Sequence, residues 1–403
     1  MGKKGKTGLL FGLVLIIIAL PLIACGGPAE PVEEKVLRIA WGWDMTNGAA
    51  STGLPAVKAA QAYTNYLNDE KGGIGGIRVE LLWADTAYKA DRAVAAYANF
   101  KARGMLSLSA MAAHEVAAVI PMATRDQIPV TNISPSFDTM VPTANPWAFS
   151  PYPMIGDGFT AFMMWLKAEG KTPAKVALLG WDSPYGRMAE RTAERFAGEF
   201  GVEVVAIQVI SPRATEAASQ LTALAKENPD YIFITTVEAP AGMILKEAKR
   251  MGLTDKIQFV GNHWDAGQDV IKYAGEDVVD GFIGIHPLVT YEEEVPGVVL
   301  AKKLMQKYEG EFITSSGYLI GLTNIHFMWA AVEDALAAVG YENMSGVAVK
   351  DALENFKDRD MLGISPPITI TPDDHRGPFE RVLQWQGGKR IPISDWIATP
   401  LPK

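Results

Sequence analysis

Short apolar runs alternate with amphipathic segments along the chain from residue 36 onward. The first apolar run, Val36–Trp43 (VLRIAWGW), predicts a buried strand, and a helical pattern follows over about 53–71. Further strands are expected at 77–85, 105–110 and 128–134, with helices at about 91–103 and 113–125. Uninterrupted apolar strands separated by helices are typical of a parallel sheet covered on both faces.

The same alternation then starts again and predicts a second sheet. Its expected strands are 175–182, 203–210, 231–237, 257–264 and 281–289. Residues 296–356 are almost entirely helical in pattern, and a proline-rich crossing at 364–367 precedes a hairpin over 381–396 with its turn at Gly387 and Gly388. Late helices followed by a closing hairpin indicate that the chain returns to the first unit before it ends on the second.

The fold class expected from this order is α/β, with two doubly wound parallel-sheet lobes joined by crossover strands. We expect residues 36–152 and 290–363 to form the N-terminal lobe. Residues 153–289 and 364–403 are expected to form the C-terminal lobe. Open α/β sheets bind ligands at the carboxyl ends of their strands, which places a ligand cleft between the lobes.

The N-terminus has the pattern of a secretory signal. Three lysines precede an apolar run over 7–24, and small residues lie before Cys25, the one cysteine of the chain. The segment 22–25 (LIAC) resembles the bacterial lipobox, so we expect a lipoprotein signal peptide over 1–24, lipidation at Cys25 and a solvated tether over 25–35. An uncleaved membrane anchor is the alternative that the pattern leaves open.

Composition narrows the class of protein. The 403 residues are 48% hydrophobic and 21% charged, which excludes a disordered chain and allows more than one core. A mean hydropathy of +0.07 excludes a polytopic membrane protein. The net charge is -9, and removal of the signal with its three lysines leaves -12. An acidic body without a basic patch argues against nucleic acid as a partner.

Motifs for catalysis and cofactor binding are missing from the sequence. It contains no G-x-S-x-G elbow and no Walker loop, and His114-Glu115 lacks the second histidine of H-E-x-x-H. The five histidines show no metal-ligand spacing. The glycine-rich stretch 72–76 lies between a helix and a strand, the reverse of a phosphate cradle, and is interpreted as a helix C-cap and turn. The apolar helix at 159–166 is interpreted as core. We therefore expect no enzyme, no metal and no cofactor.

Five motifs, each weak alone, occur in order across the chain. They lie at 39–53 (IAWGWDMTNGAASTG), 68–74 (NDEKGGI), 128–136 (Ile-Pro leading to Ser-Pro-Ser), 183–186 (SPYG) and 374–377 (DHRG). Together they resemble the type I periplasmic solute-binding proteins, in the branch that serves leucine/isoleucine/valine-type ABC importers. The resemblance covers residues 37–396. It implies two lobes that close on a small ligand without performing chemistry.

The resemblance also implies which residues of the first lobe contact the ligand. In the family, the turn that opens the third helix presents a hydroxyl and backbone amides to a ligand carboxylate. This turn falls on Ala112 and Ala113, which keep the amides but lack the hydroxyl. The next family contacts fall on Ser136 and Asp138, where a threonine is usual at the second position. A carboxylate at residue 138 would repel an anionic group. Thr52 falls where an aromatic residue often lines the first loop.

For the second lobe, Tyr185 matches the tyrosine that is expected to close over the ligand. The acidic residue that pairs with a ligand ammonium in the family aligns with His263. Asp265 can take that role or cap the helix that follows it, Glu238 is another candidate, or the charge is absent.

Three tryptophans, Trp43, Trp181 and Trp264, follow or end predicted strands on the cleft side. Each alone fits core or rim as well as a binding site, but together they indicate an apolar or aromatic ligand face.

The function expected from these observations is a lipid-anchored solute receptor of an ABC importer. It would bind an apolar or aromatic amino acid, or a related carboxylate or amide, and a membrane permease would recognise the closed form. A monomer is expected. Two alternatives stay open, a ligand-sensing module for a signalling partner and a lipid-anchored hydrolase; the missing nucleophile motif argues against the second. The residues do not name the solute.

Overall fold

The computed structural model describes residues 2, 5, 34–140 and 142–401. Residues 36–403 form a compact unit by themselves, separate from residues 1–35. Most of the expected signal peptide over 1–24, Cys25 and most of the tether lie outside the described residues. Among the helices of the described part, none combines the length and the apolar character that a membrane crossing requires.

The first sheet has five parallel strands in the order β2-β1-β3-β4-β5. Its strands are β1 (Val36–Trp43), β2 (Arg78–Asp85), β3 (Leu108–Ala110), β4 (Val130–Asn132) and β5 (Ala148–Phe149). The helices along this stretch are α1 (Ala50–Lys71), α2 (Ala90–Ala102), α3 (Ala113–Asp126) and α4 (Phe137–Met140). Because side chains of β1 alternate, Ile39 and Trp41 enter the core beside α1, whereas Ala40 enters the core with α2 and α3.

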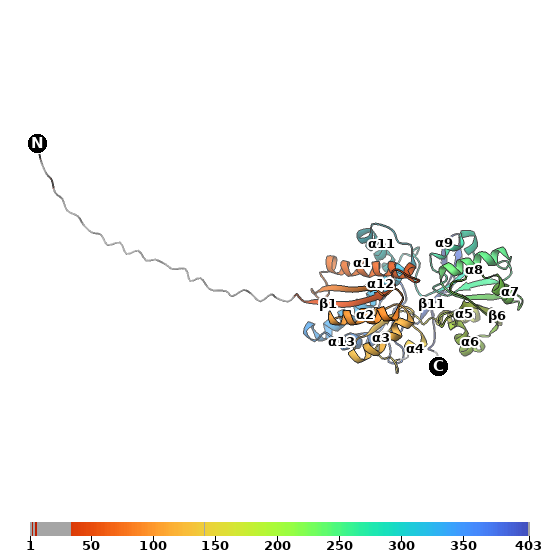
Figure 1. Ribbon diagram of the computed structural model, residues 1–403, viewed down its shortest axis with the longest axis horizontal. Coiled ribbons are helices and arrows are strands. Elements are labelled where there is room, and N and C mark those ends of the chain that lie inside the picture. Colours follow the sequence, from red (N-terminus) through yellow and green to blue (C-terminus); the bar gives the residue numbers. More distant parts are fainter. Residues whose placement is uncertain (1, 3–4, 6–33, 141, 402–403) are drawn as a thin grey trace. The chain divides into compact units, whose positions relative to one another are not determined.

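The second sheet has the order β12-β11-β10-β9-β8-β6-β7, and β13 also pairs with β11. Its strands are β6 (Ala174–Trp181), β7 (Val202–Ile210), β8 (Tyr231–Thr235), β9 (Gln258–Gly261), β10 (Ile283–His286), β11 (Phe379–Gln386), β12 (Lys389–Pro392) and β13 (Ile397–Ala398). The helices that cover it are α5 (Asp157–Ala168), α6 (Met188–Phe200), α7 (Ala218–Ala225), α8 (Glu238–Arg250), α9 (Val270–Ala274) and α10 (Glu276–Val279) (Figure 1). Strands β6 to β10 are parallel and β11 is antiparallel to β10.

Helices from the later part of the chain pack on the first sheet. They are α11 (Pro296–Leu304), the π-helical turn η1 (Met305–Glu309), α12 (Ser316–Val339), the 3-10 turn η2 (Tyr341–Asn343) and α13 (Gly346–Glu354). Helix α12 lies along α1, and the two share one core with β1 (Figure 1). The chain then crosses to β11 of the second sheet. The fold is therefore two α/β lobes, and the chain crosses between the two sheets after β5, after β10 and after α13.

The expected fold class and most expected elements are confirmed. The glycine-rich stretch ends α1, where Gly72 has φ 71° and its N–H bonds to Leu67 O. The apolar helix expected at 159–166 is the buried part of α5. The hairpin turns at Gly387 and Gly388, with φ 54° and 76°, values that disfavour residues with a Cβ. Strands expected at 128–134 and 281–289 are shorter. Strand β4 ends at Asn132, before α4 and β5 of the same sheet, and β10 ends at His286, where the chain leaves for the other lobe.

Arg376 lies where these crossings meet, and its side chain is 1% exposed. Its Nη1 donates to Asp157 Oδ2 at 2.5 Å and to Thr399 Oγ1 at 2.9 Å, and Nη2 donates to Thr399 O at 3.0 Å. Its Nε lies 3.2 Å from Asp374 Oδ1. Since Asp157 begins α5 after the first crossing and Arg376 lies on the third, one guanidinium ties the two crossings to the end of the chain.

The second crossing is fixed in a similar way. Arg381 on β11 donates from Nη1 and Nη2 to the two carboxylate oxygens of Glu293, at 2.9 and 2.7 Å. Planar two-point pairing of this kind is stronger than a single charged hydrogen bond. Asn262, after β9, donates to Ile155 O of the first crossing at 3.1 Å. The connections between the lobes are thus held by specific polar contacts at their second-lobe ends.

We expect Arg376→Gln to lower the free energy of unfolding by about 3–5 kcal/mol at pH 8, because it leaves the buried Asp157 carboxylate without its charged partner. The loss should be smaller at pH 5, since burial raises the pKa of Asp157 to about 6 and the carboxyl can then bind a proton. Urea unfolding measures both. Arg103→Gln is the matched control: Arg103 pairs with Glu80 at 2.9 Å with half its side chain exposed, and its loss should cost about 0–1 kcal/mol. Equal losses in the two variants would contradict this assignment.

Glu380 predicts a second, pH-dependent effect. The residue is 0% exposed and neither carboxyl oxygen has a hydrogen-bond partner in the described part of the chain. Burial raises the pKa of Glu380 well above its ordinary value and that of Asp265 to about 8. The folded state therefore keeps protons that the unfolded state loses, so stability should fall as pH rises from 7 to 8.5.

The expected slope is about 1.4 kcal/mol per pH unit for Glu380 as long as it keeps its proton, and the share of Asp265 falls off as the pH passes 8. Histidines do not obscure it, because above pH 7 they are neutral in both states. In the Glu380→Gln variant, the fall of unfolding free energy with pH should lack the contribution of this carboxyl. At pH 8.5 the variant should have a higher Tm than the wild type in calorimetry. A slope unchanged by the substitution would show that Glu380 is ionised in the folded protein.

Candidate ligand-binding site

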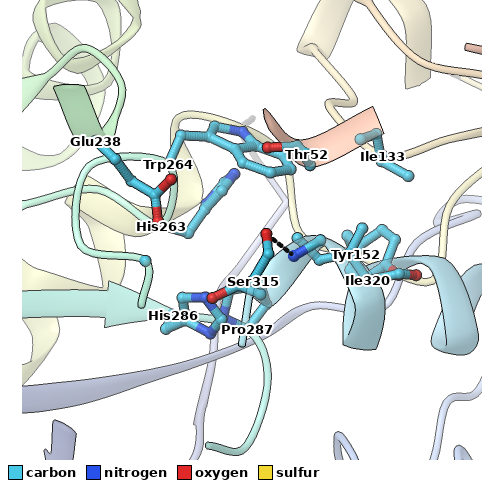
Figure 2. Close-up of a pocket in the computed structure, with 13 residues that line it drawn as sticks. Thr52, Ile133, Tyr152, Glu238, His263, Trp264, His286, Pro287, Ser315 and Ile320 are labelled. Atoms are coloured by element: carbon cyan, nitrogen blue, oxygen red, sulfur yellow. Dashed lines mark hydrogen bonds between the residues drawn. The ribbon is translucent and has the colours of Figure 1, made fainter. Parts of the chain in front are cut away.

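A pocket lies between the two sheets and draws its lining from both lobes (Figure 2). Its lining residues are Thr52, Ile133, Tyr152, Glu238, His263, Trp264, Gly267, His286, Pro287, Ser315, Ser316, Gly317 and Ile320. In Figure 2, Glu238, His263 and His286 lie across from Thr52, Tyr152 and Ile320. The cavity volume is about 20 Å³, which is room for about one water molecule. A solute can therefore enter only when the lining separates.

Two glycines of α12 bring the first-lobe part of the lining together. A Cβ on Gly317 would lie 2.6 Å from Thr52 O, and one on Gly321 would lie 2.3 Å from Ala56 O. Both distances are shorter than real Cβ contacts, so only glycine lets α12 approach α1 this closely. The approach places the start of α12 directly beside Thr52.

The turn before α12 presents hydroxyl and amide groups to the pocket. Ser315 is the N-cap of α12, and its Oγ accepts the Gly317 N–H at 3.2 Å (Figure 2). The backbone of Ser315 is held in turn by Tyr291, whose hydroxyl donates to Ser315 O at 3.2 Å. Thr52 is fixed by the loop after β1, where Asp44 accepts three backbone N–H groups, those of residues 46, 47 and 49.

The second lobe contributes the loop that follows β9. Its conformation is set by Asp265, which is buried and accepts from Thr236 N at 2.7 Å, Thr236 Oγ1 at 2.6 Å and Asn262 N at 3.2 Å. The loop turns His263 and Trp264 toward the first lobe, with their rings 4.8 Å apart. Trp264 packs against the core of the first lobe, so it bridges the lobes as well as lining the pocket.

Both histidines of the pocket are neutral. Burial lowers the pKa of His263 to about 3. The nearest acid to it is Glu380, at 3.7 Å from Nδ1, and burial raises the pKa of Glu380 well above its ordinary value. Burial also lowers the pKa of His286 well below its ordinary value. These imidazoles can exchange hydrogen bonds with a solute, but they bring no charge.

Glu238 is the acid that lines the pocket. Its Oε1 accepts the Asp269 N–H at 3.0 Å, and a Cβ on Gly267 would collide with the same oxygen. Burial raises the pKa of Glu238 to about 7. At neutral pH this carboxyl is therefore close to the midpoint of its titration, and a nearby charge decides its protonation state.

A direct hydrogen bond joins the lobes at the edge of the pocket. Gln268, which follows the β9 loop, donates its backbone N–H to Ser316 Oγ at 3.2 Å. Together with the packing of Trp264, this contact closes the pocket. When the lining moves apart, the same groups can hydrogen-bond a small solute. Within residues 34–140 and 142–401, no group of three or more His, Cys, Asp or Glu side chains is placed to hold a metal ion.

Of the twelve residues that the sequence nominated, the structure brings Thr52, Glu238, His263 and Trp264 to the pocket. Asp265 lies directly behind it, supporting the β9 loop. Tyr185 lies outside the lining, where its hydroxyl donates to Thr236 O at 2.8 Å. Tyr185 does not line the pocket, so its role in closing over the ligand stays a prediction. Trp181 also lies outside the lining, with its ring centroid 6.3 Å from that of Tyr185.

The other five nominated residues lie away from this pocket. Trp43 is 0% exposed and donates from Nε1 to Ser109 Oγ at 2.8 Å. Ala112 and Ala113 begin α3, and the Ala112 N–H is taken by Glu115 Oε2 at 3.0 Å. Ser136 bonds to Thr139, and the exposed Asp138 lies 3.7 Å from Arg191 of the second lobe. Their contact with a ligand stays a prediction.

Sequence reasoning missed most of the lining. His286 ends β10 on the same edge as the β9 loop, so the rule that located Trp264 could have located it too. The serines at 315 and 316 are typical of a helix N-cap, so the sequence did contain a signal for the start of α12. Tyr152 and Ile320 had no local signal, because they meet only through the packing of α12, where Tyr152 donates to Ile320 O at 2.5 Å.

Solved structures with similar folds are known. A branched-chain amino acid ABC transporter from Thermus thermophilus with bound valine has 23% identity and a TM-score of 0.82, covering 91% of this chain and 98% of that one. A fatty acid ABC transporter substrate-binding protein from Thermomonospora curvata has 19% identity and a TM-score of 0.77, with 91% and 94% covered. The LivJ protein from Streptococcus pneumoniae in complex with isoleucine has 18% identity and a TM-score of 0.73, with 90% and 100% covered.

At these identities the likeness establishes the fold. No curated protein sequence matches the chain. The family itself follows from a sequence model: that of the periplasmic binding proteins matches residues 36–388, nearly the whole of the two lobes. With two α/β lobes and a pocket lined from both, the chain belongs to the periplasmic binding protein family, a family of binding proteins rather than enzymes.

Proposed function

We propose that the protein is an extracytoplasmic solute receptor of an ABC importer. It binds a small amino acid-like solute, either an apolar or aromatic amino acid or a related carboxylate or amide, and delivers it to a membrane permease without chemical change. The observation that supports this most is the pocket lined from both lobes and closed by the Gln268–Ser316 hydrogen bond. A binding site of this geometry couples solute occupancy to lobe closure.

The lining supports the class of solute. Ile133, Tyr152, Trp264 and Ile320 supply an apolar surface, and Ser315, Ser316 and Thr52 supply hydroxyls. This mixture of apolar surface and a few polar groups suits a small organic molecule with one polar end. The similar structures contain bound valine or isoleucine, or are named for fatty acids. These compounds also combine an apolar part with one polar end.

The boundaries of the lobes belong to the same proposal. Residues 36–152 and 290–363 move as one lobe, and residues 153–289 and 364–403 move as the other. Support comes from α11 to α13, which share a core with α1 and β1, and from β11, which pairs with β10. The three crossings then act as the hinge. A monomer suffices, because both halves of the pocket come from one chain.

We expect thermal melts of residues 36–403, refolded to remove bound solute, to identify the solute class from a panel of amino acids, organic acids and amides. A solute at about 100 times its Kd adds about 2.7 kcal/mol of stability, a rise of several degrees in Tm. Trp264→Leu should weaken binding of that solute at least tenfold, because it removes part of the lining and the packing that closes the lobes.

The matched control is Trp83→Leu, since Trp83 is 52% exposed and lies away from the pocket. It should bind the solute like the wild type. If no solute in the panel raises the Tm, the receptor assignment is wrong. If both substitutions weaken solute binding equally, this pocket is not the binding site.

We also propose that Cys25 carries a lipid that anchors the receptor to a membrane. The full-length chain, expressed in a bacterium, should fractionate with membranes, lack residues 1–24 and carry an acyl mass at Cys25. Cys25→Ser should keep the precursor unprocessed, because the residue supplies the sulfur that the lipid is attached to. Mass spectrometry of the membrane fraction distinguishes this from an uncleaved anchor, which would retain residues 1–24 in both proteins.

A further inference from the structure

Two buried polar groups without hydrogen-bond partners lie next to each other at the pocket. His263, on the loop after β9, lines the pocket and is 6% exposed (Figure 2). Its Nδ1 is buried and has no hydrogen-bond partner in the described part of the chain. Glu380 on β11 is 0% exposed, and both of its carboxyl oxygens also lack partners there. Glu380 Oε1 lies 3.7 Å from His263 Nδ1, so each group is placed to become the partner of the other.

Hydrogen bonds and close packing hold the loop that carries His263. The His263 N–H is accepted by Asn262 Oδ1 at 2.9 Å, and Asn262 Nδ2 donates to Ile155 O at 3.1 Å. A Cβ on Gly158 would lie 2.2 Å from Asn262 Oδ1, so α5 packs directly against this amide. The 3.7 Å between Nδ1 and Oε1 is slightly longer than a hydrogen bond, and a small rotation of either side chain closes it.

The charges that act on this pair are compensated. Arg376 acts on Glu380 and Asp157 acts on His263, but Arg376 and Asp157 already bond to each other at 2.5 Å. His286 also interacts with His263, and it is neutral because burial lowers its pKa well below the ordinary value. With these groups satisfied or neutral, Glu380 and His263 decide each other's protonation.

The protonation of the pair determines what His263 offers to a solute. A neutral imidazole carries one proton, on either Nδ1 or Nε2. Burial raises the pKa of Glu380 well above its ordinary value, so the carboxyl keeps a proton that it can donate to Nδ1, which leaves the ring proton on Nε2. If the carboxyl proton passes to Nδ1, both ring nitrogens carry protons. Nε2 is a donor in both cases, and it becomes an acceptor only if an ionised Glu380 stays buried beside a neutral ring.

Nε2 is the ring nitrogen left for the pocket, because Nδ1 is buried beside Glu380. We propose that Glu380 is a positioning residue that holds His263 in the form protonated at Nε2, so that His263 donates a hydrogen bond to a carboxylate or carbonyl oxygen of the solute. The inference rests on the proposed function and deepens it. The family resemblance implies an acid at residue 263 that pairs with an ammonium. A donor at this position takes an oxygen instead, so any ammonium group of the solute lies elsewhere in the pocket.

The position of the proton on His263 is tested first, in the solute-free protein. Long-range ¹H–¹⁵N correlation spectra of residues 36–403, labelled at histidine, distinguish a proton on Nε2 from one on Nδ1, and the signals missing from His263→Phe assign the residue. At pH 7 we expect a proton on Nε2. Glu380→Leu, which removes the donor, should give a mixture of the two forms. Glu380→Gln, whose amide N–H can donate in place of the carboxyl, should restore the Nε2–H form, a rescue that a merely structural role would not produce.

Binding is then tested with probes that differ in their polar end. One set is leucine, 4-methylpentanoate, 4-methylpentanamide and 3-methylbutylamine, and the other is phenylalanine, 3-phenylpropionate, 3-phenylpropanamide and 2-phenylethylamine. In calorimetric titrations at pH 7, we expect the tightest probe with a carboxylate or amide to bind at least tenfold more tightly than the matching amine, which has no oxygen.

The variants separate the roles of the two residues. His263→Phe keeps a ring and removes the donor, so it should weaken the tightest oxygen-bearing probe at least tenfold. Glu380→Leu should weaken the same probe by a smaller factor, and Glu380→Gln by less than Glu380→Leu. His326→Phe is the matched control, since His326 lies on α12 outside the lining with its Nε2 3.1 Å from Asp360 O, and it should bind like the wild type.

The inference is overturned if His263 carries its proton on Nδ1 alone, because Glu380 is then an ionised acceptor. It is also overturned if an amine binds more tightly than the matching carboxylate and amide, or if His263→Phe binds the oxygen-bearing probe like the wild type. The receptor function stands in these cases, since a probe still binds. If no probe binds the wild type, the proposed function fails together with the assignment of the solute oxygen, while the spectra still decide whether Glu380 sets the protonation of His263.

Discussion

The burial of one guanidinium at the junction of the lobes is the constraint on which the rest of the structure depends. Arg376 could not be buried without Asp157, Thr399 and Asp374 around it, and these groups come from two crossings and the end of the chain. Their convergence fixes where each crossing enters the second sheet. Because the crossings are fixed there, the lobes can change their separation only by bending in the short segments between these contacts and the first sheet. The pocket lies beside this junction, so its shape follows from the same contacts.

Different interactions position the residues on the two sides of the pocket. On the first-lobe side, close backbone packing does the positioning: the glycines of α12 bring Ser315 to Gly317 against Thr52, and the groups presented are hydroxyls, amides and apolar side chains. On the second-lobe side, buried titratable groups dominate, and burial keeps most of them neutral. His263, Glu380 and Asp265 all favour their uncharged forms. A low local dielectric then makes any remaining charge count for more than it would at the surface.

The periodicity of apolar residues was sufficient to predict the architecture, but it was not sufficient to predict which residues line the pocket. Val36–Trp43 and the helices after it carry clear apolar periods, so the order of strands and helices, the hairpin and the two lobes could be predicted. Which face of a strand a residue occupies is harder. Trp43 ends β1 on the expected edge, yet its side chain points into the core and bonds to Ser109. Tyr152, Ser316 and Ile320 depend on α12 returning to α1 after more than 250 residues, a long-range contact that local patterns do not encode. Arg390 lies in a hairpin whose sequence looks exposed, and its burial follows from the packing of β12 against β11.

The small size of the closed pocket has a kinetic consequence. With room for about one water molecule, the pocket admits a solute only after its lining has moved apart. In the proposed receptor, capture and release both require the lobes to part. The residence time of a solute then depends on how often the lobes open as well as on the strength of its contacts. A permease that grips the two lobes could unload the receptor simply by holding them apart, without ever competing for the residues that hold the cargo.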